Sequence, residues 1–323
     1  MGLPDTITHI IIDEIQKIPR LLDIVQRLMK KSKKFFVMTG SSARKLKKGG
    51  ANLLAGRAFV YDLFPFTSFE LGSHFDLDTA LQCGTLPQII SYPHENERQE
   101  FLNAYSHTYL KEEIWGEHFI RKLDPFRHFL EIAAQHNGKI INFSNIARDV
   151  GVDDKTIQAY FSILEDTLIG FFLESFHHSF RKRLSDKPKF YFFDTGVVRS
   201  LSRTINVPLL PKTLSYGNAF EHFIILECLR LANYHRLDYR FTYLRTASDV
   251  EIDLIVERPG KPLLCIEIKS NDHINANDIS SMQRLCADLP HCEVVCFANE
   301  KYPKIINDIR ILPWQQGLKE YFF

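Results

Sequence analysis

The apolar positions near the start of the chain alternate between short continuous runs and a helically spaced set. Continuous apolar runs at residues 9–12 and 35–38 are typical of buried strands. Between them, apolar residues recur every three or four positions over 20–31, which predicts a helix. A third strand is expected over 57–63. Strands alternating with a helix, with polar residues at the strand ends, predict an α/β domain over 1–72 with its ligand site at the carboxyl ends of the strands.

The middle segment, residues 73–200, is predicted to begin with helices and to contain a helix-turn-helix. Apolar spacing between residues 95 and 137 fits helices of a bundle. A short helix over 142–150 is followed by Gly151 and by a second helix over 155–167. Two helices separated by a short turn that contains glycine are typical of the helix-turn-helix motif.

Two strands, over 169–176 and 189–194, are expected to follow the second helix and to form a wing. The local charge of this wing is strongly positive. Its basic residues are Arg181, Lys182, Arg183, Lys187 and Lys189. We expect the wing to contact DNA phosphates, with Lys155 and Gln158 of the second helix facing a groove. The alternative is that this winged helix only packs against neighbouring domains, because its second helix carries a single lysine and ends in two acidic residues.

The third segment, residues 214–323, is predicted to be a second α/β domain. A helix over 216–231 precedes three strands, and Arg-Pro-Gly at 258–260 predicts a tight hairpin between the second and third of them. A helix, a strand, a short strand and a terminal helix follow. The expected ranges are 240–244, 251–257 and 263–269 for the three strands, 277–287 for the helix, and 293–298 and 310–312 for the later strands. The order of helix, three strands, helix and strand resembles the core of PD-(D/E)XK nucleases.

The predicted hairpin brings charged residues together. A hairpin centred on Gly260 places Asp253 opposite Glu267, and cross-strand neighbours have Cβ atoms about 5 Å apart. Lys269 is two residues further along the strand and therefore faces the same side. Two adjacent carboxylates repel unless a cation lies between them, and Mg²⁺ prefers oxygen ligands. We therefore predict a Mg²⁺ site at Asp253 and Glu267, with Glu221 reaching the same metal from the preceding helix.

This constellation predicts a metal-dependent hydrolysis of phosphodiester bonds. The metal would activate water and steady the scissile phosphate, while Lys269 would orient that water or offset developing charge. The candidate catalytic residues are thus Glu221, Asp253, Glu267 and Lys269. The alternative is that Glu267 and Lys269 form only a surface ion pair, which contributes ~0–1 kcal/mol.

Composition narrows the classes of function. Hydrophobic residues make up 45% and charged residues 24% of the chain, as in soluble globular proteins. The net charge of +1 gives no overall attraction to nucleic acid, so any contact with DNA must be local. The sequence contains neither an apolar run of the ~18 residues that a membrane helix requires nor a signal-peptide pattern. The six cysteines form no CxxC pair, which predicts reduced thiols and a cytoplasmic location without membrane association.

Three stretches of the first segment give the chain a family resemblance. The stretches are IIIDEIQKIP, VMTGSSARKL and LLAGRAFVYDLFPFTSFEL. In this order they resemble the latter half of a prokaryotic AAA-type ATP-binding domain, in a family whose C-terminal domain of unknown function has a PD-(D/E)XK nuclease-like fold. The resemblance implies that Asp13 holds magnesium and that Glu14 polarises the attacking water. It also implies that Thr39 or Ser41 senses the γ-phosphate and that Arg57 is an arginine finger, which in trans would require a homo-oligomer.

The resemblance begins partway through the ATPase domain, at the Walker B strand. The phosphate-binding pattern G-x-x-x-x-G-K-[ST] does not occur in the sequence. Without its backbone cradle and lysine, nothing grips the β- and γ-phosphates. We therefore expect an N-terminally truncated domain without ATP turnover, and ATP as a cofactor only in an intact family member.

Two functions follow from these patterns. The first is a DNA-associated protein of the AAA-type ATPase family whose nuclease-like C-terminal domain uses Mg²⁺. The second is a non-catalytic remnant of an ATP-binding protein that binds DNA or another protein through its winged helix. The expected fold is a multi-domain α/β chain, with a partial P-loop AAA-type sheet, a helical and winged-helix middle, and a PD-(D/E)XK-like α/β domain.

Overall fold

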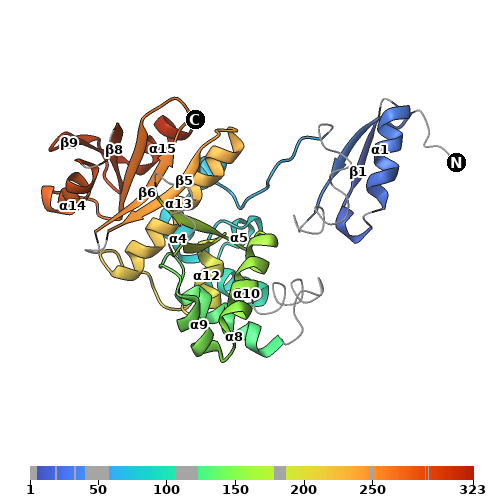
Figure 1. The fold of residues 1–323 in the computed structure, drawn as a ribbon, viewed down its shortest axis with the longest axis horizontal. Coiled ribbons are helices and arrows are strands. Elements are labelled where there is room, and N and C mark those ends of the chain that lie inside the picture. Colours follow the sequence, from blue (N-terminus) through green and yellow to red (C-terminus); the bar gives the residue numbers. More distant parts are fainter. Residues whose placement is uncertain are drawn as a thin grey trace. The chain divides into compact units, whose positions relative to one another are not determined.

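The computed structural model in Figure 1 divides into two compact units, which are described separately. One unit comprises Met1–Tyr61 with Ala159–Gly170, and the other comprises Asp62–Gln158 with Phe171–Phe323. The structure describes residues 6–18, 20–32, 34–40, 58–106, 123–177, 187–246, 250–287, 289 and 291–323.

The smaller unit contains a helix packed on a pair of parallel strands. Strand β1 (His9–Ile12) pairs with β2 (Phe35–Met38), and helix α1 (Leu21–Lys31) connects them after the short 3-10 helix η1 (Ile15–Lys17). Leu22 of α1 is buried against apolar residues of η1 and of the strands. The two strands and the helix confirm the ranges expected from apolar spacing.

The third strand expected over 57–63 is wrong for the part that the structure describes, residues 58–63, which carry no strand. Val60 and Leu63 are 86% and 95% exposed. Apolar content alone suggested this strand, but a strand forms only where its backbone finds a neighbouring strand to bond. Instead, the backbone N–H of Phe64 donates to the hydroxyl of Tyr234 at 3.0 Å, so the chain continues along a helix of the larger unit.

The larger unit is built on one mixed sheet. Within the described residues it has eight strands in the order β4-β3-β5-β6-β7-β8-β10-β9. Strands β5, β6 and β7 are successively antiparallel, whereas β3 pairs with β5, β7 with β8 and β8 with β10 in parallel. The strands are β3 (Gly170–Ser175), β4 (Lys189–Phe192), β5 (Arg240–Arg245), β6 (Glu251–Glu257), β7 (Leu263–Lys269), β8 (Cys292–Ala298), β9 (Lys304–Ile306) and β10 (Ile309–Pro313).

Helices cover both faces of the central strands. On one face, Leu264 and Ile266 of β7 share the largest core with α13 (Leu214–Tyr234) and α15 (Trp314–Phe322). On the other face, Cys265 packs with Met282 of α14 (Ala276–Ala287). Alternate residues of β7 therefore enter opposite cores, as the period of a strand requires. The long helix α13 runs beside this sheet in Figure 1 and carries one member of the acidic site described below.

The helix-turn-helix elements are present where the sequence predicts them. Helix α9 (Phe143–Val150) begins after Asn142, whose side chain caps it, and ends at Gly151 with a positive φ of 78°. Helix α10 (Asp154–Asp166) follows directly. The strands expected to form the wing are also present, as β3 and β4, and they extend the eight-stranded sheet. One sheet therefore joins strands from the expected middle and C-terminal segments.

Further helices surround the start of the larger unit. They are α3 (Ser68–Leu71), η3 (Gly72–His74), α4 (Leu77–Cys83), α5 (Pro87–Ser91), α6 (Glu95–Ala104), α8 (Leu123–Gln135) and α12 (Thr195–Leu201). Helix α3 is fixed to α13, because the hydroxyl and the backbone N–H of Ser68 both donate to the buried carboxylate of Glu227. Arg230, one turn later, donates to the carbonyl oxygens of Phe66 and Phe193 at 3.2 and 2.8 Å. Each helix in the described part of the chain is too short or too polar to cross a membrane.

Candidate metal centre

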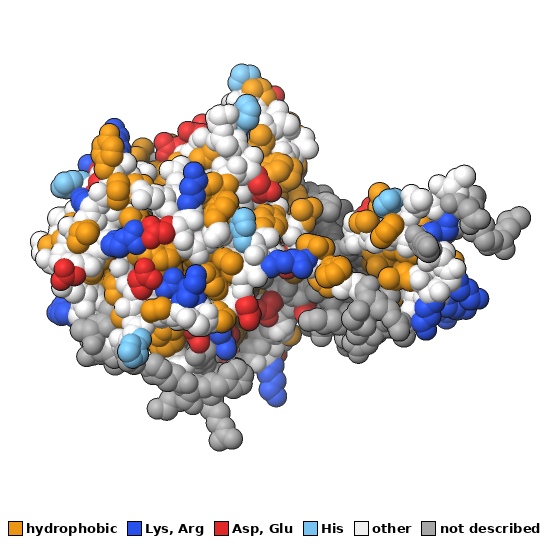
Figure 2. Space-filling view, turned by 90° about the horizontal axis from the view of Figure 1, so that it is seen from above, with side chains coloured by type: hydrophobic (Ala, Val, Ile, Leu, Met, Phe, Trp, Pro, Cys, Tyr) orange, Lys and Arg blue, Asp and Glu red, His pale blue; other side chains and the backbone are white. Residues whose placement is uncertain are grey.

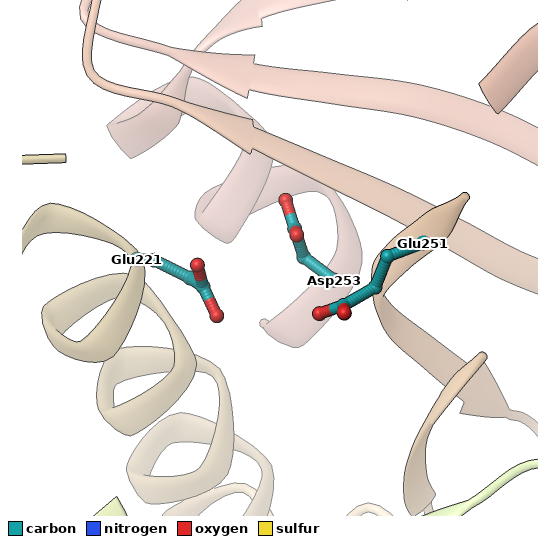
Figure 3. Close-up of side chains that lie close together, drawn as sticks. All are labelled: Glu221, Glu251 and Asp253. Atoms are coloured by element: carbon teal, nitrogen blue, oxygen red, sulfur yellow. The ribbon is translucent and has the colours of Figure 1, made fainter. Parts of the chain in front are cut away.

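Three carboxylates of the larger unit converge where the first part of α13 lies beside β6. Glu221 projects from the helix towards Glu251 and Asp253 on the strand (Figure 3). One oxygen from each of the three side chains lies within 4.8 Å of the other two. Carboxylate oxygens at such separations suit a hard divalent cation. This geometry joins Glu221 and Asp253, two of the residues expected from the sequence, in one group.

Glu251 is a member of this group that the sequence analysis missed. It begins β6, two residues before Asp253, so both side chains lie on one face of the strand. The signal was present in the sequence as Glu-x-Asp within a strand-like run.

The hairpin register is the predicted one. Leu254 lies opposite Ile266 and Val256 opposite Leu264, as a turn centred on Gly260 requires. Continued by one residue, this register sets Asp253 beside Glu267. The Asp253 carboxylate also accepts a hydrogen bond of 2.7 Å from the backbone N–H of Ile268, which holds it against β7.

Glu267 and Lys269 form an ion pair on β7 at the edge of the carboxylate group. The Lys269 Nζ lies 2.6 Å from Glu267 Oε1. The Glu267 side chain is only 8% exposed, unlike a surface ion pair, and within the described residues its Oε2 has no hydrogen-bond partner. A buried carboxylate oxygen without a partner is costly, so this atom is available to a ligand.

Burial and mutual repulsion shift the pKa values of the two hairpin carboxylates upwards. The pKa of Asp253 is well above its usual value, chiefly because of burial and then because Glu267 and Glu221 are close. Burial likewise raises the pKa of Glu267, against the lowering effect of Lys269. A raised carboxylate pKa means that the protein disfavours the charged form unless a cation compensates it.

A second lysine enters the group from β4. The Lys189 Nζ lies 3.4 Å from Glu221 Oε1 and also forms an ion pair with Glu251. Tyr191, on the same strand, donates from its hydroxyl to Glu221 Oε1 at 2.8 Å. The expectation that Lys189 adds to the positive charge of an exposed wing is wrong, because its side chain is only 4% exposed. The neighbouring Lys187 is exposed.

The charges around the group do not balance. Four carboxylates, those of Glu221, Glu251, Asp253 and Glu267, face two ammonium groups, those of Lys189 and Lys269. With every group ionised the cluster has two negative charges in excess. A divalent cation would neutralise this excess, and the oxygen-only donor set is of the kind that Mg²⁺, Mn²⁺ and Ca²⁺ accept. The residues present therefore fit a hard divalent metal.

The acidic pair predicted in the smaller unit has another environment. Asp13 is exposed and accepts a hydrogen bond from the Thr39 hydroxyl, and that hydroxyl in turn accepts one of 3.2 Å from the Glu14 backbone N–H. Thr39 is thus next to the acidic pair. Ser41 and Arg57 lie outside the described residues.

The structure describes only some of the residues that are predicted to contact DNA. Lys155 and Gln158 are exposed on α10, and their spacing of three places them on one side of the helix. Arg181, Lys182 and Arg183 lie outside the described residues. On the molecular face in Figure 2, the described lysine and arginine side chains of the larger unit are interspersed with acidic ones and form no basic stripe.

Three family models match successive parts of the chain. Residues 3–72 match an AAA domain, residues 74–207 match a domain of unknown function (DUF8612), and residues 216–316 match a second domain of unknown function (DUF4143). Lys189 and Tyr191 thus come from one matched range, and the four carboxylates come from another.

The curated relatives are two mycobacterial proteins. The chain is 26% identical over 263 residues to an uncharacterized protein of Mycobacterium tuberculosis, and equally to one of Mycobacterium bovis. Each alignment covers 81% of this chain but 58% of the relative, so the chain spans little more than half the length of those proteins. No solved structure matches. These similarities support an AAA-type, ATPase-like relationship, with two further domains of unknown function.

Proposed function

We propose that the C-terminal part of this protein binds a divalent cation, physiologically Mg²⁺, and hydrolyses phosphodiester bonds in DNA. The observation that carries the proposal is the convergence of Glu221, Glu251 and Asp253 within 4.8 Å, beside the Glu267–Lys269 pair. The order of α13, β5, β6, β7, α14 and β8, with Glu-x-Lys on β7, resembles the PD-(D/E)XK nuclease core.

Each side chain has a role that its position supports. Glu221, Glu251 and Asp253 would hold the cation, and the unpartnered Oε2 of Glu267 is a further oxygen ligand beside them. The bound cation would supply Lewis acidity, which favours hydroxide over water and stabilises charge on the phosphate. Lys269, held by Glu267 and 32% exposed, can donate to the attacking water or to a phosphate oxygen. Water would give up a proton to solvent and add to phosphorus, the bond to the leaving oxygen would break, and that oxygen would take up a proton from solvent.

Cleavage of supercoiled DNA tests the proposal. The purified chain should nick DNA in the presence of Mg²⁺ or Mn²⁺ and should not nick it with EDTA. Asp253→Asn and Lys269→Ala should each reduce the rate on the order of 100-fold or more, since each removes a charge at the reacting centre. The matched control is Asp308→Asn, the same chemical change at an exposed turn between β9 and β10, at the far end of the sheet from β4. Nicking that survives in both site variants would disprove the assignment.

A second candidate function is DNA binding without cleavage. Lys155 and Gln158 favour it, because both are exposed on one side of the second helix of the helix-turn-helix. Fluorescence anisotropy with a labelled duplex would then detect binding that Lys155→Ala weakens and that the exposed control Lys301→Ala leaves unchanged. Binding without nicking in any divalent metal would favour this function over the first.

A further inference from the structure

We infer that Lys189 is a built-in cation that occupies the carboxylate group in the metal-free protein and must withdraw for a divalent cation to enter. This inference rests on the proposed function, since it concerns how the same carboxylates take up their metal. It assigns to β4 a role in controlling the site, although β4 contributes no carboxylate ligand.

The contacts of Lys189 are those of a cation in a ligand site. Its Nζ pairs with Glu221 at 3.4 Å and with Glu251 at a closer distance, and these are two of the three converging carboxylates. The side chain is 4% exposed, so it is inserted into the cluster and does not lie over it. The Lys189 Nζ also lies over the aromatic ring of Tyr243, 5.3 Å from the ring centre.

Lys189 and a divalent cation compete for the same oxygens. A metal ion needs several lone pairs of Glu221 and Glu251 at about 2 to 2.5 Å, and two positive charges at such separations repel strongly in a buried site. The lysine side chain has four rotatable bonds and can withdraw, whereas Tyr191 continues to hold Glu221 through its hydroxyl. Exchange of one cation for the other leaves the carboxylates compensated before and after the metal enters.

Lys269 does not share this role. It pairs with Glu267, which lies outside the group of three converging ligand atoms, and it is 32% exposed. The contacts of Lys189 and Lys269 therefore indicate different roles. Lys189 occupies the ligand site, and Lys269 flanks it.

Titration calorimetry with Mn²⁺ alone, at constant pH, tests the inference. Lys189→Met and Lys189→Gln should each bind Mn²⁺ about tenfold or more tightly than the unaltered chain, because a competing unit charge is removed. Lys187→Met is the matched control, with the same change two residues earlier at an exposed position, and its affinity should equal that of the unaltered chain.

Thermal unfolding gives a second readout for variants that fold poorly without metal. Removal of Lys189 leaves the carboxylates uncompensated, so both variants should be less stable than the unaltered chain in EDTA. Saturating Mn²⁺ should raise their melting temperatures more than that of the unaltered chain. A variant that folds only when Mn²⁺ is present supports the inference equally, because the ion then replaces the missing ammonium group.

The outcomes separate the inference from the proposed function. If the unaltered chain binds Mn²⁺ and both Lys189 variants bind it equally or more weakly, Lys189 is a supporting residue of the site and the inference is wrong, while the proposed function stands. Binding that appears only in the Lys189 variants supports the inference but contradicts the proposed function, which requires the unaltered chain to bind the ion. If neither the unaltered chain nor any variant binds Mn²⁺, the metal site itself is absent and both proposals are refuted.

Discussion

The two acidic sites of this protein resemble each other in sequence but differ in their surroundings. Asp13 and Glu14 directly follow strand β1 of the smaller unit, where Asp13 is exposed and hydrogen-bonded to Thr39. Asp253 lies in the larger unit, where burial and two further carboxylates raise its pKa. Water can solvate the exposed Asp13 carboxylate, whereas the buried Asp253 carboxylate depends on charged groups of the protein or on a bound cation. The demand for a bound cation therefore arises from burial and from the number of converging carboxylates.

The larger unit also compensates other buried charges by direct pairing. Arg230 and Glu227, one turn apart on α13, are 2% and 0% exposed, and Arg230 Nη1 lies 3.7 Å from Glu227 Oε1. The smaller unit offers a contrasting pair, Lys17 with Glu14, in which the lysine is 70% exposed.

Arg230→Met should have the largest effect on stability. It leaves Glu227 as an unpaired buried carboxylate and removes donors to two backbone carbonyls, which is expected to cost about 3–5 kcal/mol of the free energy of unfolding. Urea unfolding followed by the fluorescence of the buried Trp314 measures this. Lys17→Met, which breaks the exposed pair, should leave the same transition unchanged. Equal effects of the two substitutions would contradict the contrast drawn here.

The stability of the larger unit should also depend on His222. Burial lowers the pKa of His222 to about 4, whereas in the unfolded chain it is about 6.5. Between these values the unfolded state binds more protons, so the contribution of His222 is complete above pH 6.5 and is lost as the pH falls to 4. The loss is about 3 kcal/mol.

The measurement is the difference between the unaltered chain and His222→Gln across this pH range. The difference isolates His222, because the raised pKa values of Asp253 and Glu267 act with the opposite sign and are common to both proteins. The free energies of unfolding of the two proteins should converge towards pH 4. A constant difference would show that His222 is not the titrating group.

Thr39→Val should have a small and local effect. It removes the hydroxyl that donates to Asp13 and accepts from the Glu14 backbone, at a cost of about 1 kcal/mol. Hydrogen exchange of the Glu14 amide should become faster, while the amides of β6 stay as protected as before. Faster exchange in both regions would mean that the two acidic sites are coupled.

The addition of ATP is expected to have no measurable effect on the purified chain. The sequence contains no glycine-rich loop ending in Gly-Lys-Ser/Thr, the motif whose backbone would cradle the phosphates, and we therefore expect no nucleotide binding. Titration of the purified chain, already saturated with Mg²⁺, with Mg²⁺-ATP should produce no binding heat at millimolar nucleotide. A saturable isotherm would contradict the expectation.

Much of the fold and part of the site could be predicted from the sequence. The ranges of β6 and β7 were predicted without error, because both runs are strongly apolar and the turn between them contains proline and glycine. The same turn set the register that joins Asp253 to Glu267. The apolar pattern of the two strands and the residues of the turn determine such a hairpin, independently of distant parts of the chain.

The expectations that the structure contradicts concern contacts between segments that are distant in the sequence. Residues 58–63 are as apolar as a strand, but whether a strand finds a partner is not encoded in its own residues. The sequence predicts Lys189 in an exposed wing because lysine is usually exposed, whereas the structure buries it through ion pairs with Glu221 of α13 and Glu251 of β6. Glu251 could have been found, since it shares a strand face with Asp253.

The most direct test of this account is the binding of Mn²⁺ to the unaltered chain, to Asp253→Asn and to Asp13→Asn, measured by titration calorimetry at one pH. The account predicts saturable binding that Asp253→Asn abolishes or weakens at least about tenfold and that Asp13→Asn leaves intact, because the buried group holds the ion and the exposed pair does not. Binding that is lost in Asp13→Asn and retained in Asp253→Asn would contradict it, as would the absence of any binding to the unaltered chain.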